Sequence, residues 1–486
     1  MPREPLRQEL QALLGDGALL SEPAEIAPLL VDQRRLYQGR ALAVAAPRST
    51  EEVARIVHWC NQHRVAVVPQ GGNTSYCGGA TPDESGRQLL LTLGRMNRIR
   101  ALDAANFSMT VEAGCVLATV QRAADTAERY FPLSLGSEGS CQIGGNLSTN
   151  AGGLNVVRYG MARELVLGIE AVLPDGSVLD GLKSLRKDNT GYDLKSLLIG
   201  AEGTLGVITA ATLKLWPKMR SSATAFVGLA DPAQALELLG ALRAAAGERL
   251  SSFELLPRIA IELTARHISG VTDPLGTPFP WYVLCELTAA ADEPLDELLQ
   301  QILGEAAART PPLDAVLATS ERVRAAFWRL RESVPDAQRR SGVSLKHDIS
   351  VPVASLPPFI REASQWVHEH VPDGTLVCYG HAGDGNLHFN VNYTAGGGVA
   401  SAGDAVSAAG AASPAAATFL AREPQIRRAI HDLVMRFQGS ISAEHGIGRL
   451  KREELARYAQ APTLAAMRAI KQALDPNGIM NPGKLL

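Results

Sequence analysis

Three glycine-rich loops lie in the first half of the chain, at 68–75, 132–153 and 199–208. Glycine allows several backbone N–H groups to converge into a concave nest, which can hold a phosphate group without any lysine. Such loops disappear between about residues 219 and 440, where predicted helices and strands alternate instead. The contrast predicts two differently built domains, of which the first folds around a phosphate-bearing ligand.

The sequences of the loops indicate which ligand to expect. One such loop alone is more often an ordinary turn, but three in one domain favour a flavin. The loops contain neither the GxGxxG pattern of Rossmann sites nor the GxxxxGK[ST] pattern of P-loops, so a nicotinamide or ATP enzyme is the weaker interpretation. The loop residues predicted to bind the cofactor are Pro69, Gly71, Gly72, Asn73, Thr74, Ser75, Pro132, Gly136, Gly144, Gly145, Thr149, Gly152, Gly153, Glu202, Gly206 and Ile208.

The length of 486 residues exceeds what one hydrophobic core usually supports, so several domains are expected. Ser49 followed by Glu52 predicts a capping box that begins a helix. Residues 394–418 are nearly all Ala, Gly and Ser, which predicts a mobile surface loop. We expect an α+β protein with a helical lead-in at 1–40, a cofactor domain at 41–218, a substrate domain at 219–440 and a C-terminal segment at 441–486.

The overall composition is that of a soluble globular enzyme, with 46% apolar and 20% charged residues. Lys and Arg number 47 against 50 Asp and Glu, so the net charge of −3 gives no basis for nucleic-acid binding. The six cysteines form no CxxC pair, which fits reduced thiols. Without an apolar signal core or a long apolar run, a cytoplasmic location is expected, and peripheral membrane contact stays open.

A histidine-rich pattern in the last quarter of the chain predicts a metal site. His381-Ala-Gly-Asp-Gly-Asn-Leu-His388 joins two predicted strands, and Glu444-His445 follows later. Two imidazoles and a carboxylate can hold Zn²⁺ or Mn²⁺ and still leave coordination positions for a substrate. His381, His388 and Glu444 are therefore the predicted metal ligands. The alternative is that the two histidines only form hydrogen bonds within a tight turn.

The same pattern supplies further polar groups for a reaction. His388 and Asn390 share one face of the predicted strand, because side chains alternate between its two faces, and Asn390 is a predicted substrate contact. His445 is the residue left to take a hydroxyl proton, since an imidazole titrates near neutral pH. The alternative role for His445 is that of a fourth metal ligand or a support for the other three.

A carboxylate substrate needs cationic partners, and the candidates are Arg331 and Lys346. The planar fork of arginine can grip a carboxylate through two parallel hydrogen bonds. Lys346, Asp348 and Ser350 alternate with Leu345, His347, Ile349 and Val351, which places Lys346 on the polar face of a predicted strand. On the residues alone, two solvated surface charges are the stronger alternative.

These motifs resemble those of the vanillyl-alcohol oxidase flavoprotein family, in particular its D-2-hydroxyglutarate dehydrogenase and D-lactate dehydrogenase branch. The resemblance begins near residue 40 and is carried by segments 69–83, 132–160, 184–192, 199–208, 381–392, 442–448 and 475–484. It implies FAD in a first domain of two α/β subdomains. It also implies a cap domain over the isoalloxazine ring and a C-terminal helical segment that returns to the flavin.

The resemblance extends to individual residues. Related dehydrogenases use His, His and Glu as metal ligands at the matching positions, and the resemblance strengthens the substrate-binding roles of Arg331 and Lys346. The 2-hydroxyglutarate enzymes carry a hydroxyl residue four places after that arginine, whereas this chain has Pro335. Proline cannot donate a hydrogen bond, so this position departs from the pattern for recognising a second carboxylate.

Two more cofactor contacts, Tyr159 and Asn481, are implied by the resemblance only. In some relatives a histidine of the first loop bonds covalently to the flavin. This chain offers Tyr76 and Cys77 there, so FAD is expected to bind non-covalently.

Taken together, these features predict an FAD-dependent dehydrogenase that oxidises a D-2-hydroxy acid, D-2-hydroxyglutarate first, to the 2-keto acid. The expected electron acceptor is an electron-transfer flavoprotein or a quinone, and relatives suggest a homodimer. D-lactate, D-malate or glycolate are the alternative substrates. A metal-dependent hydrolase or a non-catalytic flavin-binding protein is a more remote alternative.

Overall fold

The computed structural model describes residues 3–15, 17–309, 311, 313–393 and 413–486. Most of the predicted mobile loop, 394–412, lies outside the described residues. Its last part is helical instead, in α15 (Pro414–Ala421), because the side chain of Ser413 accepts a hydrogen bond from the Ala416 N–H and caps the helix.

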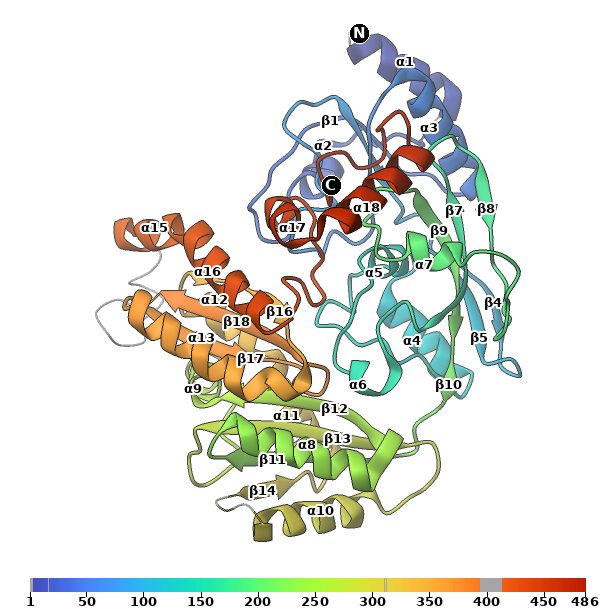
Figure 1. The fold of residues 1–486 in the computed structure, drawn as a ribbon. Coiled ribbons are helices and arrows are strands. Elements are labelled where there is room, and N and C mark those ends of the chain that lie inside the picture. The colour runs from blue at the N-terminus through green and yellow to red at the C-terminus, as the bar shows by residue number, and fades with distance from the viewer. Residues whose placement is uncertain (1–2, 16, 310, 312, 394–412) are drawn as a thin grey trace. The chain divides into compact units, whose positions relative to one another are not determined.

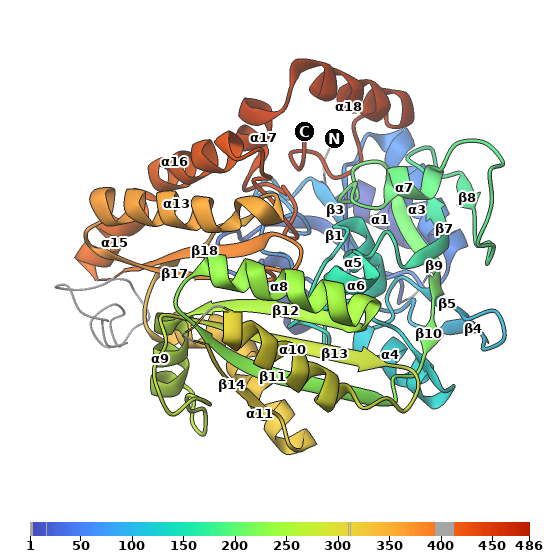
Figure 2. The same cartoon turned by 60° about the horizontal axis from the view of Figure 1, so that its bottom comes forward.

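The chain divides into two compact units, which Figures 1 and 2 trace by residue number. Unit 1 comprises Met1–Gly153, Gly160–Lys218 and Glu444–Leu486. Unit 2 comprises Leu154–Tyr159 and Met219–Ala443. Unit 1 therefore joins the glycine-rich half of the chain to its C-terminal segment.

Unit 1 is built on two main sheets. Its strands are β1 (Ala41–Ala45), β2 (Val67–Gln70), β3 (Gln88–Thr92), β4 (Ile99–Asp103), β5 (Ser108–Glu112), β6 (Arg129–Tyr130), β7 (Val166–Val172), β8 (Val178–Asp180), β9 (Val207–Lys214) and β10 (Trp216–Pro217). The first sheet is parallel in the order β1-β3-β2, and the second is antiparallel in the order β4-β5-β9-β7-β8. The short β6 and β10 pair with each other.

The helices of unit 1 are α1 (Arg3–Leu14), α2 (Pro23–Ile26), η1 (Ala27–Leu30), α3 (Thr50–His63), α4 (Leu117–Thr126), α5 (Ile143–Ser148), α7 (Leu194–Leu198), α17 (Arg452–Tyr458) and α18 (Ala461–Leu474). Helix α3 begins as predicted, because the Ser49 side chain accepts from the Glu52 N–H. Glu52 in turn accepts from the Arg48 N–H. Arg64 ends the helix in the left-handed conformation at φ 53°, and strand β2 begins three residues later at Val67.

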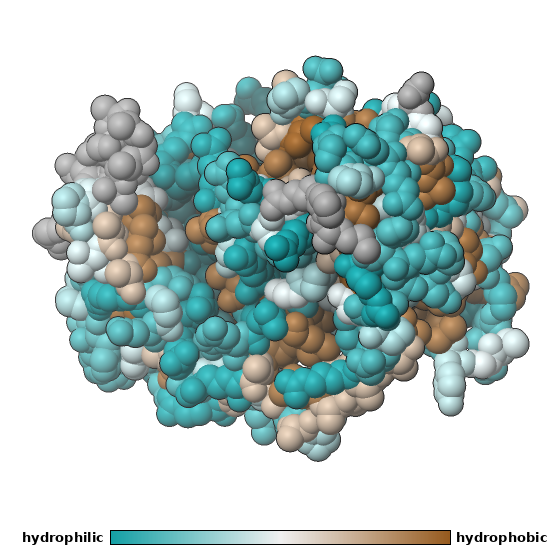
Figure 3. Space-filling view, turned by 90° about the horizontal axis from the view of Figure 1, so that it is seen from above, coloured by the Kyte–Doolittle hydropathy of each residue, from teal (hydrophilic) through white to brown (hydrophobic). Residues whose placement is uncertain are grey.

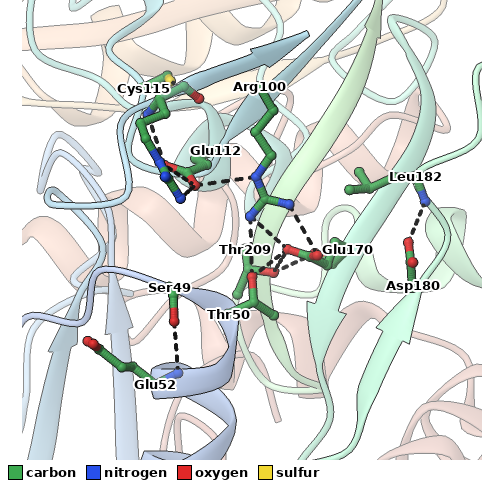
Figure 4. Close-up of polar contacts among 11 residues, drawn as sticks. Ser49, Thr50, Glu52, Arg100, Glu112, Cys115, Glu170, Asp180, Leu182 and Thr209 are labelled. Atoms are coloured by element: carbon green, nitrogen blue, oxygen red, sulfur yellow. Dashed lines mark hydrogen bonds and ion pairs between the residues drawn. The ribbon is translucent and has the colours of Figure 1, made fainter.

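Ion pairs and hydrogen bonds of charged side chains link strands of the larger sheet of unit 1, as Figure 4 shows. Arg100 on β4 donates to Glu112 on β5 and to Glu170 on β7, and Glu170 also accepts from Thr50 and Thr209. Burial by itself raises the pKa of Glu170, but the hydrogen bonds from Arg100 and the two threonines outweigh it and hold the pKa below its usual value. Both carboxylates are therefore charged in the folded protein at neutral pH.

Unit 2 also contains two sheets. Its strands are β11 (Ser221–Leu229), β12 (Leu250–Pro257), β13 (Trp281–Ala289), β14 (Asp314–Leu317), β15 (Ser344–Leu345), β16 (Asp348–Ser350), β17 (Gly374–Tyr379) and β18 (Asn386–Tyr393). The first sheet is antiparallel in the order β12-β13-β11-β14. In the second, β18 pairs with β17 on one side and with β15 and β16 on the other. The strand predicted around Lys346 is thus interrupted at residues 346–347, although its register against β18 continues.

The helices of unit 2 are α6 (Val156–Tyr159), α8 (Pro232–Ala246), η2 (Gly247–Arg249), α9 (Arg258–His267), α10 (Leu295–Arg309), α11 (Glu321–Glu332), α12 (Val334–Arg340), η3 (Val353–Ser355), α13 (Leu356–His370), α15 and α16 (Glu423–Arg436). Helices α8 and α10 cover one face of the β12-β13-β11-β14 sheet (Figure 2). Helices α9 and α11 pack against Phe226, Tyr282 and Leu284, whose side chains point to the opposite face.

The remaining composition-based expectations concern cysteines and membranes. The six cysteines are all buried and form no disulfide in the described structure, and burial raises the pKa of Cys115 to about 11. Such thiols are poor nucleophiles. Among the described helices, none has the length and apolar character that crossing a membrane requires. The face drawn in Figure 3 mixes hydrophilic and hydrophobic side chains.

Candidate flavin and hydroxy-acid site

The glycine-rich loops of unit 1 converge on one another. A Cβ atom at Gly71 in the first loop would lie 3.3 Å from the backbone nitrogen of Gly145 in the second. One at Gly72 would lie 2.2 Å from the carbonyl oxygen of Ser140, and one at Gly203 in the third loop 3.1 Å from Pro69. Side chains at these positions would clash, so glycine is what lets the backbones approach so closely.

Unsatisfied polar atoms lie in the same region and at the C-terminal segment. Gln142 Oε1, Asn146 Nδ2 and Asn481 Oδ1 are buried without a hydrogen-bond partner among the described residues. Asn481, at φ 42°, donates through Nδ2 to the carbonyl oxygens of Gly79 and Glu202. Buried polar atoms normally require partners, so this cradle fits a large polar ligand such as a flavin dinucleotide.

Three further predicted cofactor residues of unit 1, Asn73, Thr149 and Gly153, have local contacts in the structure. Thr149 donates to the Gly145 carbonyl, and Asn73 donates to Val31. A Cβ at Gly153 would meet the Ser134 carbonyl at 2.0 Å. Tyr159 differs, because it belongs to unit 2, where its hydroxyl contacts Met219 and burial raises its pKa.

Glu202 holds the loop that follows Glu444-His445. Its carboxylate accepts from the backbone N–H groups of Ile447 at 2.8 Å and Gly448 at 2.7 Å. Burial raises the pKa of Glu202, which the two N–H groups partly oppose. This residue, predicted to bind the cofactor, therefore uses its carboxylate to shape the neighbouring C-terminal loop.

The loop presents the predicted base and one predicted metal ligand. The His445 ring packs edge-on against Tyr76 of the first glycine-rich loop, with 4.9 Å between centroids. Glu444 accepts from the Gly153 N–H at 3.1 Å, so it lies beside the second glycine-rich loop. Within unit 1, the structure thus brings His445 and Glu444 to the flavin cradle.

Within unit 2, the two predicted histidine ligands lie close together. The rings of His381 and His388 have centroids 5.5 Å apart. Asp348 is a cross-strand partner of His388, and the two offer ligand atoms within 4.8 Å of each other. Asp348 is buried and accepts from Asn386 Nδ2 at 3.0 Å. The sequence placed Asp348 on the same strand face as Lys346 but predicted no function for it.

The predicted metal ligands come from both units. His381 and His388 belong to unit 2, whereas Glu444 belongs to unit 1. Imidazole and carboxylate are suitable donors for zinc or manganese, so the residue types fit such an ion.

Arg331 is not a solvated surface charge, because only 5% of it is exposed. Its Nε donates to Glu254 Oε2 at 2.5 Å, and its guanidinium lies 5.0 Å from the centroid of the Tyr379 ring. The other Glu254 oxygen contacts His381 Nδ1 at 2.5 Å. Burial raises the pKa of Glu254, but Arg331 and His381 more than offset it and hold the pKa at about 2.

Lys346 and Asn390 meet at a glutamine that the sequence did not single out. Both donate to Oε1 of Gln338 on α12, at 2.9 and 3.1 Å, and Gln338 is fully buried. Gln338 also donates to Asn392. Pro335 lies in the first turn of the same helix, where a proline breaks no hydrogen bond.

Two residues that contact the predicted site residues, Glu254 and Gln338, were not predicted from the sequence. Glu254 stands as a single charge in the otherwise apolar Phe253-Glu-Leu-Leu256 segment, which was an available signal. Gln338 gave no such signal, because it is followed in α12 by two more polar residues, Arg339 and Arg340.

Comparison with known proteins identifies the fold and family. Residues 41–181 match the family model of the FAD binding domain, and residues 218–485 match that of the C-terminal domain of FAD linked oxidases. The chain belongs to the FAD-linked oxidases. Solved structures agree on the fold: p-cresol methylhydroxylase has a TM-score of 0.76 at 18% identity, covering 99% of this chain and 96% of that one. Alkyldihydroxyacetonephosphate synthase has a TM-score of 0.72 at 16% identity, covering 99% and 85%.

Curated relatives define the branch of the family. A probable mitochondrial D-2-hydroxyglutarate dehydrogenase of Oryza sativa subsp. japonica is 38% identical over 98% of this chain and 80% of its own length. The D-2-hydroxyglutarate dehydrogenase of Xanthomonas citri pv. viticola is 37% identical over 99% and 96%. A putative mitochondrial D-lactate dehydrogenase of Schizosaccharomyces pombe is 34% identical over 98% and 89%. The FAD-linked oxidase is thus an FAD-dependent oxidoreductase of the 2-hydroxy-acid dehydrogenase branch, as its motifs predicted.

The expectation of a cytoplasmic location is contradicted. Relatives from rice, Arabidopsis thaliana, Danio rerio, Bos taurus and Rattus norvegicus are mitochondrial proteins by name. The expectation rested on the lack of an apolar signal core, which distinguishes secreted proteins but does not distinguish organellar ones, whose targeting segments are amphipathic.

Proposed function

We propose that the chain oxidises D-2-hydroxyglutarate to the corresponding 2-keto acid. The observation that carries the proposal is a pair of contact sets in unit 2: Glu254 joins Arg331 to His381, and Gln338 joins Lys346 to Asn390. The names of the relatives that match nearly the whole chain support the same substrate. FAD, when bound, accepts the hydride from the substrate Cα.

The substrate would be held by its carboxylates. Arg331 has its Nε engaged by Glu254, so the Nη edge of the guanidinium is the part that would face a carboxylate. Lys346 is held at Gln338 together with Asn390, which gives a second cationic and amide group for a dicarboxylic acid. D-lactate is the alternative substrate, favoured by Pro335 and by the relative from Schizosaccharomyces pombe.

A divalent metal would assist the reaction. His381, His388 and Glu444 are its proposed ligands, with zinc or manganese as the proposed ion. A metal so bound lowers the pKa of a coordinated hydroxyl group. Asp348 beside His388 would add negative charge that favours a cation at this position.

His445 would accept the hydroxyl proton. Its ring is packed against Tyr76, and the loop that follows it is tied to Glu202 through Ile447 and Gly448. These contacts restrain the imidazole before substrate binds, as a general base requires. The reduced enzyme would pass electrons to an electron-transfer flavoprotein or a quinone, and the protein would form homodimers.

An anaerobic visible spectrum tests the proposal. The purified, metal-replete protein is expected to show flavin bands that bleach on addition of D-2-hydroxyglutarate. A His445→Asn variant is the control, because it should keep the flavin bands and bleach at least about 100-fold more slowly. Bands that persist with D-2-hydroxyglutarate but bleach with D-lactate would replace the substrate. Bands that bleach with neither would contradict the proposed activity.

A further inference from the structure

Glu254 contacts both a proposed substrate-binding residue and a proposed metal ligand. One carboxylate oxygen accepts from Arg331 Nε and the other meets His381 Nδ1, each at 2.5 Å. We propose that Glu254 is a positioning residue that orients Arg331 and His381 together, so that carboxylate binding and metal binding depend on one buried side chain. This inference rests on the proposed function.

The backbone around Glu254 is fixed from two sides. In the sheet, Glu254 pairs with Leu284 of β13. On the other side, Leu255 exchanges two backbone hydrogen bonds with Gly380, at 2.8 and 3.0 Å. Gly380 directly precedes His381, so the strand that carries the carboxylate also holds the chain at the histidine. Such rigid support is what keeps a site geometry from relaxing.

The contact with Glu254 decides which nitrogen of His381 a metal would use. An ionised carboxylate only accepts hydrogen bonds, so the His381 proton must sit on Nδ1. Nε2 would then be the nitrogen left to hold a metal, and the carboxylate would increase its basicity. Glu254 is fully buried, and its ion pair with Arg331 favours the ionised carboxylate.

The same contact sets the plane of the Arg331 guanidinium. Its Nε is bound to Glu254, while the group lies over the Tyr379 ring at 5.0 Å. Because the guanidinium is held at Nε and against one face, its plane and the direction of its Nη edge are fixed. Glu254 therefore limits where a substrate carboxylate can bind through two parallel hydrogen bonds.

A second buried glutamate of the same sheet provides a matched control. Glu286 on β13 accepts from Arg324 Nε at 2.6 Å, and its other partners are Trp328 and Thr224. None of these partners is a proposed site residue. Glu286→Gln therefore measures the effect of neutralising a buried, arginine-paired carboxylate that has no role in the site.

Glu254→Gln is the decisive variant. A glutamine amide has one acceptor oxygen and one donor nitrogen, so it cannot accept from both partners. If the oxygen stays on Arg331, the amide nitrogen donates to His381 Nδ1 and moves the ring proton to Nε2. That change blocks the metal-binding nitrogen. If the amide takes the opposite orientation, its NH2 group faces Arg331 Nε, and two donors cannot form a hydrogen bond.

The experiment measures zinc affinity and steady-state kinetics for the wild type, Glu254→Gln and Glu286→Gln. Zinc affinity of the metal-stripped protein is determined by competition with a chelator, without substrate. Glu254→Gln is expected to bind zinc about 10- to 100-fold more weakly than the wild type, as is typical when the partner of a ligating histidine is lost. KM for D-2-hydroxyglutarate should also rise, whereas both values change less than about 3-fold in Glu286→Gln. If Glu254→Gln does not fold, Glu254→Asp takes its place, since its shorter carboxylate cannot span both partners.

The outcomes separate this inference from the proposed function. Zinc affinity and KM that match those of Glu286→Gln would overturn the inference. A wild type that binds zinc but does not oxidise D-2-hydroxyglutarate would refute the proposed substrate, while the zinc comparison would still decide the role of Glu254. A wild type that binds no zinc would overturn the metal half of the inference together with the ligand assignment.

Discussion

Two buried glutamates on neighbouring strands of unit 2 each pair with an arginine, but their other partners differ. Glu254 on β12 pairs with Arg331, and Glu286 on β13 pairs with Arg324. The two arginines lie seven residues apart on α11, about two helical turns, so they share one face of that helix. Both carboxylates face the same side of the sheet.

The difference lies in the partners that each carboxylate has besides its arginine. Glu286 accepts from the neutral donors Trp328 and Thr224, while Glu254 meets His381. The arginines differ as well, because the Arg324 side chain is 31% exposed and that of Arg331 is 6% exposed. A buried ion pair is thus no sign of function by itself. Of the two carboxylates, that of Glu254 also contacts a proposed metal ligand, His381.

Arginine removal should separate the two pairs most strongly. Arg331→Ala is expected to lower kcat/KM for D-2-hydroxyglutarate by about 100-fold or more, because the proposed contact of this buried, charge-paired arginine with the substrate would be lost. Arg324→Ala should change kcat/KM by less than about 3-fold. Steady-state kinetics with an artificial electron acceptor measures both. Equal losses in the two variants would remove the distinction between the pairs.

Stability should differ in the same direction. Arg331→Met leaves Glu254 as a poorly compensated charge in a fully buried position, so it should lower the free energy of unfolding of unit 2 by about 3 kcal/mol. The loss in Arg324→Met should be smaller, since solvent reaches Arg324 and Glu286 keeps two neutral donors. Urea unfolding followed by tryptophan fluorescence tests the order. The comparison fails if Arg324→Met is the less stable variant.

The sheet of unit 1 extends the comparison to carboxylates without a proposed site. Burial raises the pKa of Glu170 and Glu112, but their partners, above all Arg100 and Arg98, hold both below the ordinary 4.5. Their stabilising effect is therefore complete above pH 4.5 and is lost as pH falls through the lower folded-state pKa values. Arg100→Met should reduce stability at pH 7 by about 2 kcal/mol and weaken this acid dependence.

Thermal unfolding between pH 7 and pH 3 measures the effect of Arg100→Met. The matched control is Arg98→Met, whose side chain is 70% exposed and should matter less. An unchanged acid dependence in Arg100→Met would show that the threonines alone keep Glu170 ionised.

The smallest expected effect concerns the neutral donors of Glu286. Trp328→Phe removes the indole N–H that bonds to Glu286 at 2.9 Å and keeps most of the ring packing. A loss of about 1 kcal/mol in unfolding free energy is expected, with kcat/KM unchanged. A large fall in activity would mean that the Glu286 cluster also supports the site.

Local sequence patterns predicted much of the fold. The capping box at Ser49 is confirmed, because such a pattern depends on neighbours within a few residues, and the helix that it begins buries Val53, Ile56, Val57 and Cys60. The edges of elements were less accurate where one residue changes the backbone direction. Ser413 caps a helix inside the predicted loop.

For the site, the sequence by itself predicted the kinds of chemistry: glycine-rich loops for a flavin, which the family match supports, imidazoles and a carboxylate for a metal, and cations for a carboxylate substrate. Only the tertiary structure decided which other side chains contact the predicted site residues. Glu254 lies 127 residues from His381 and 77 from Arg331, and Gln338 lies 52 from Asn390. No periodicity reports a contact across such separations. The pairing of strands and the docking of α11 and α12 create these contacts, and burial then makes each of them strong.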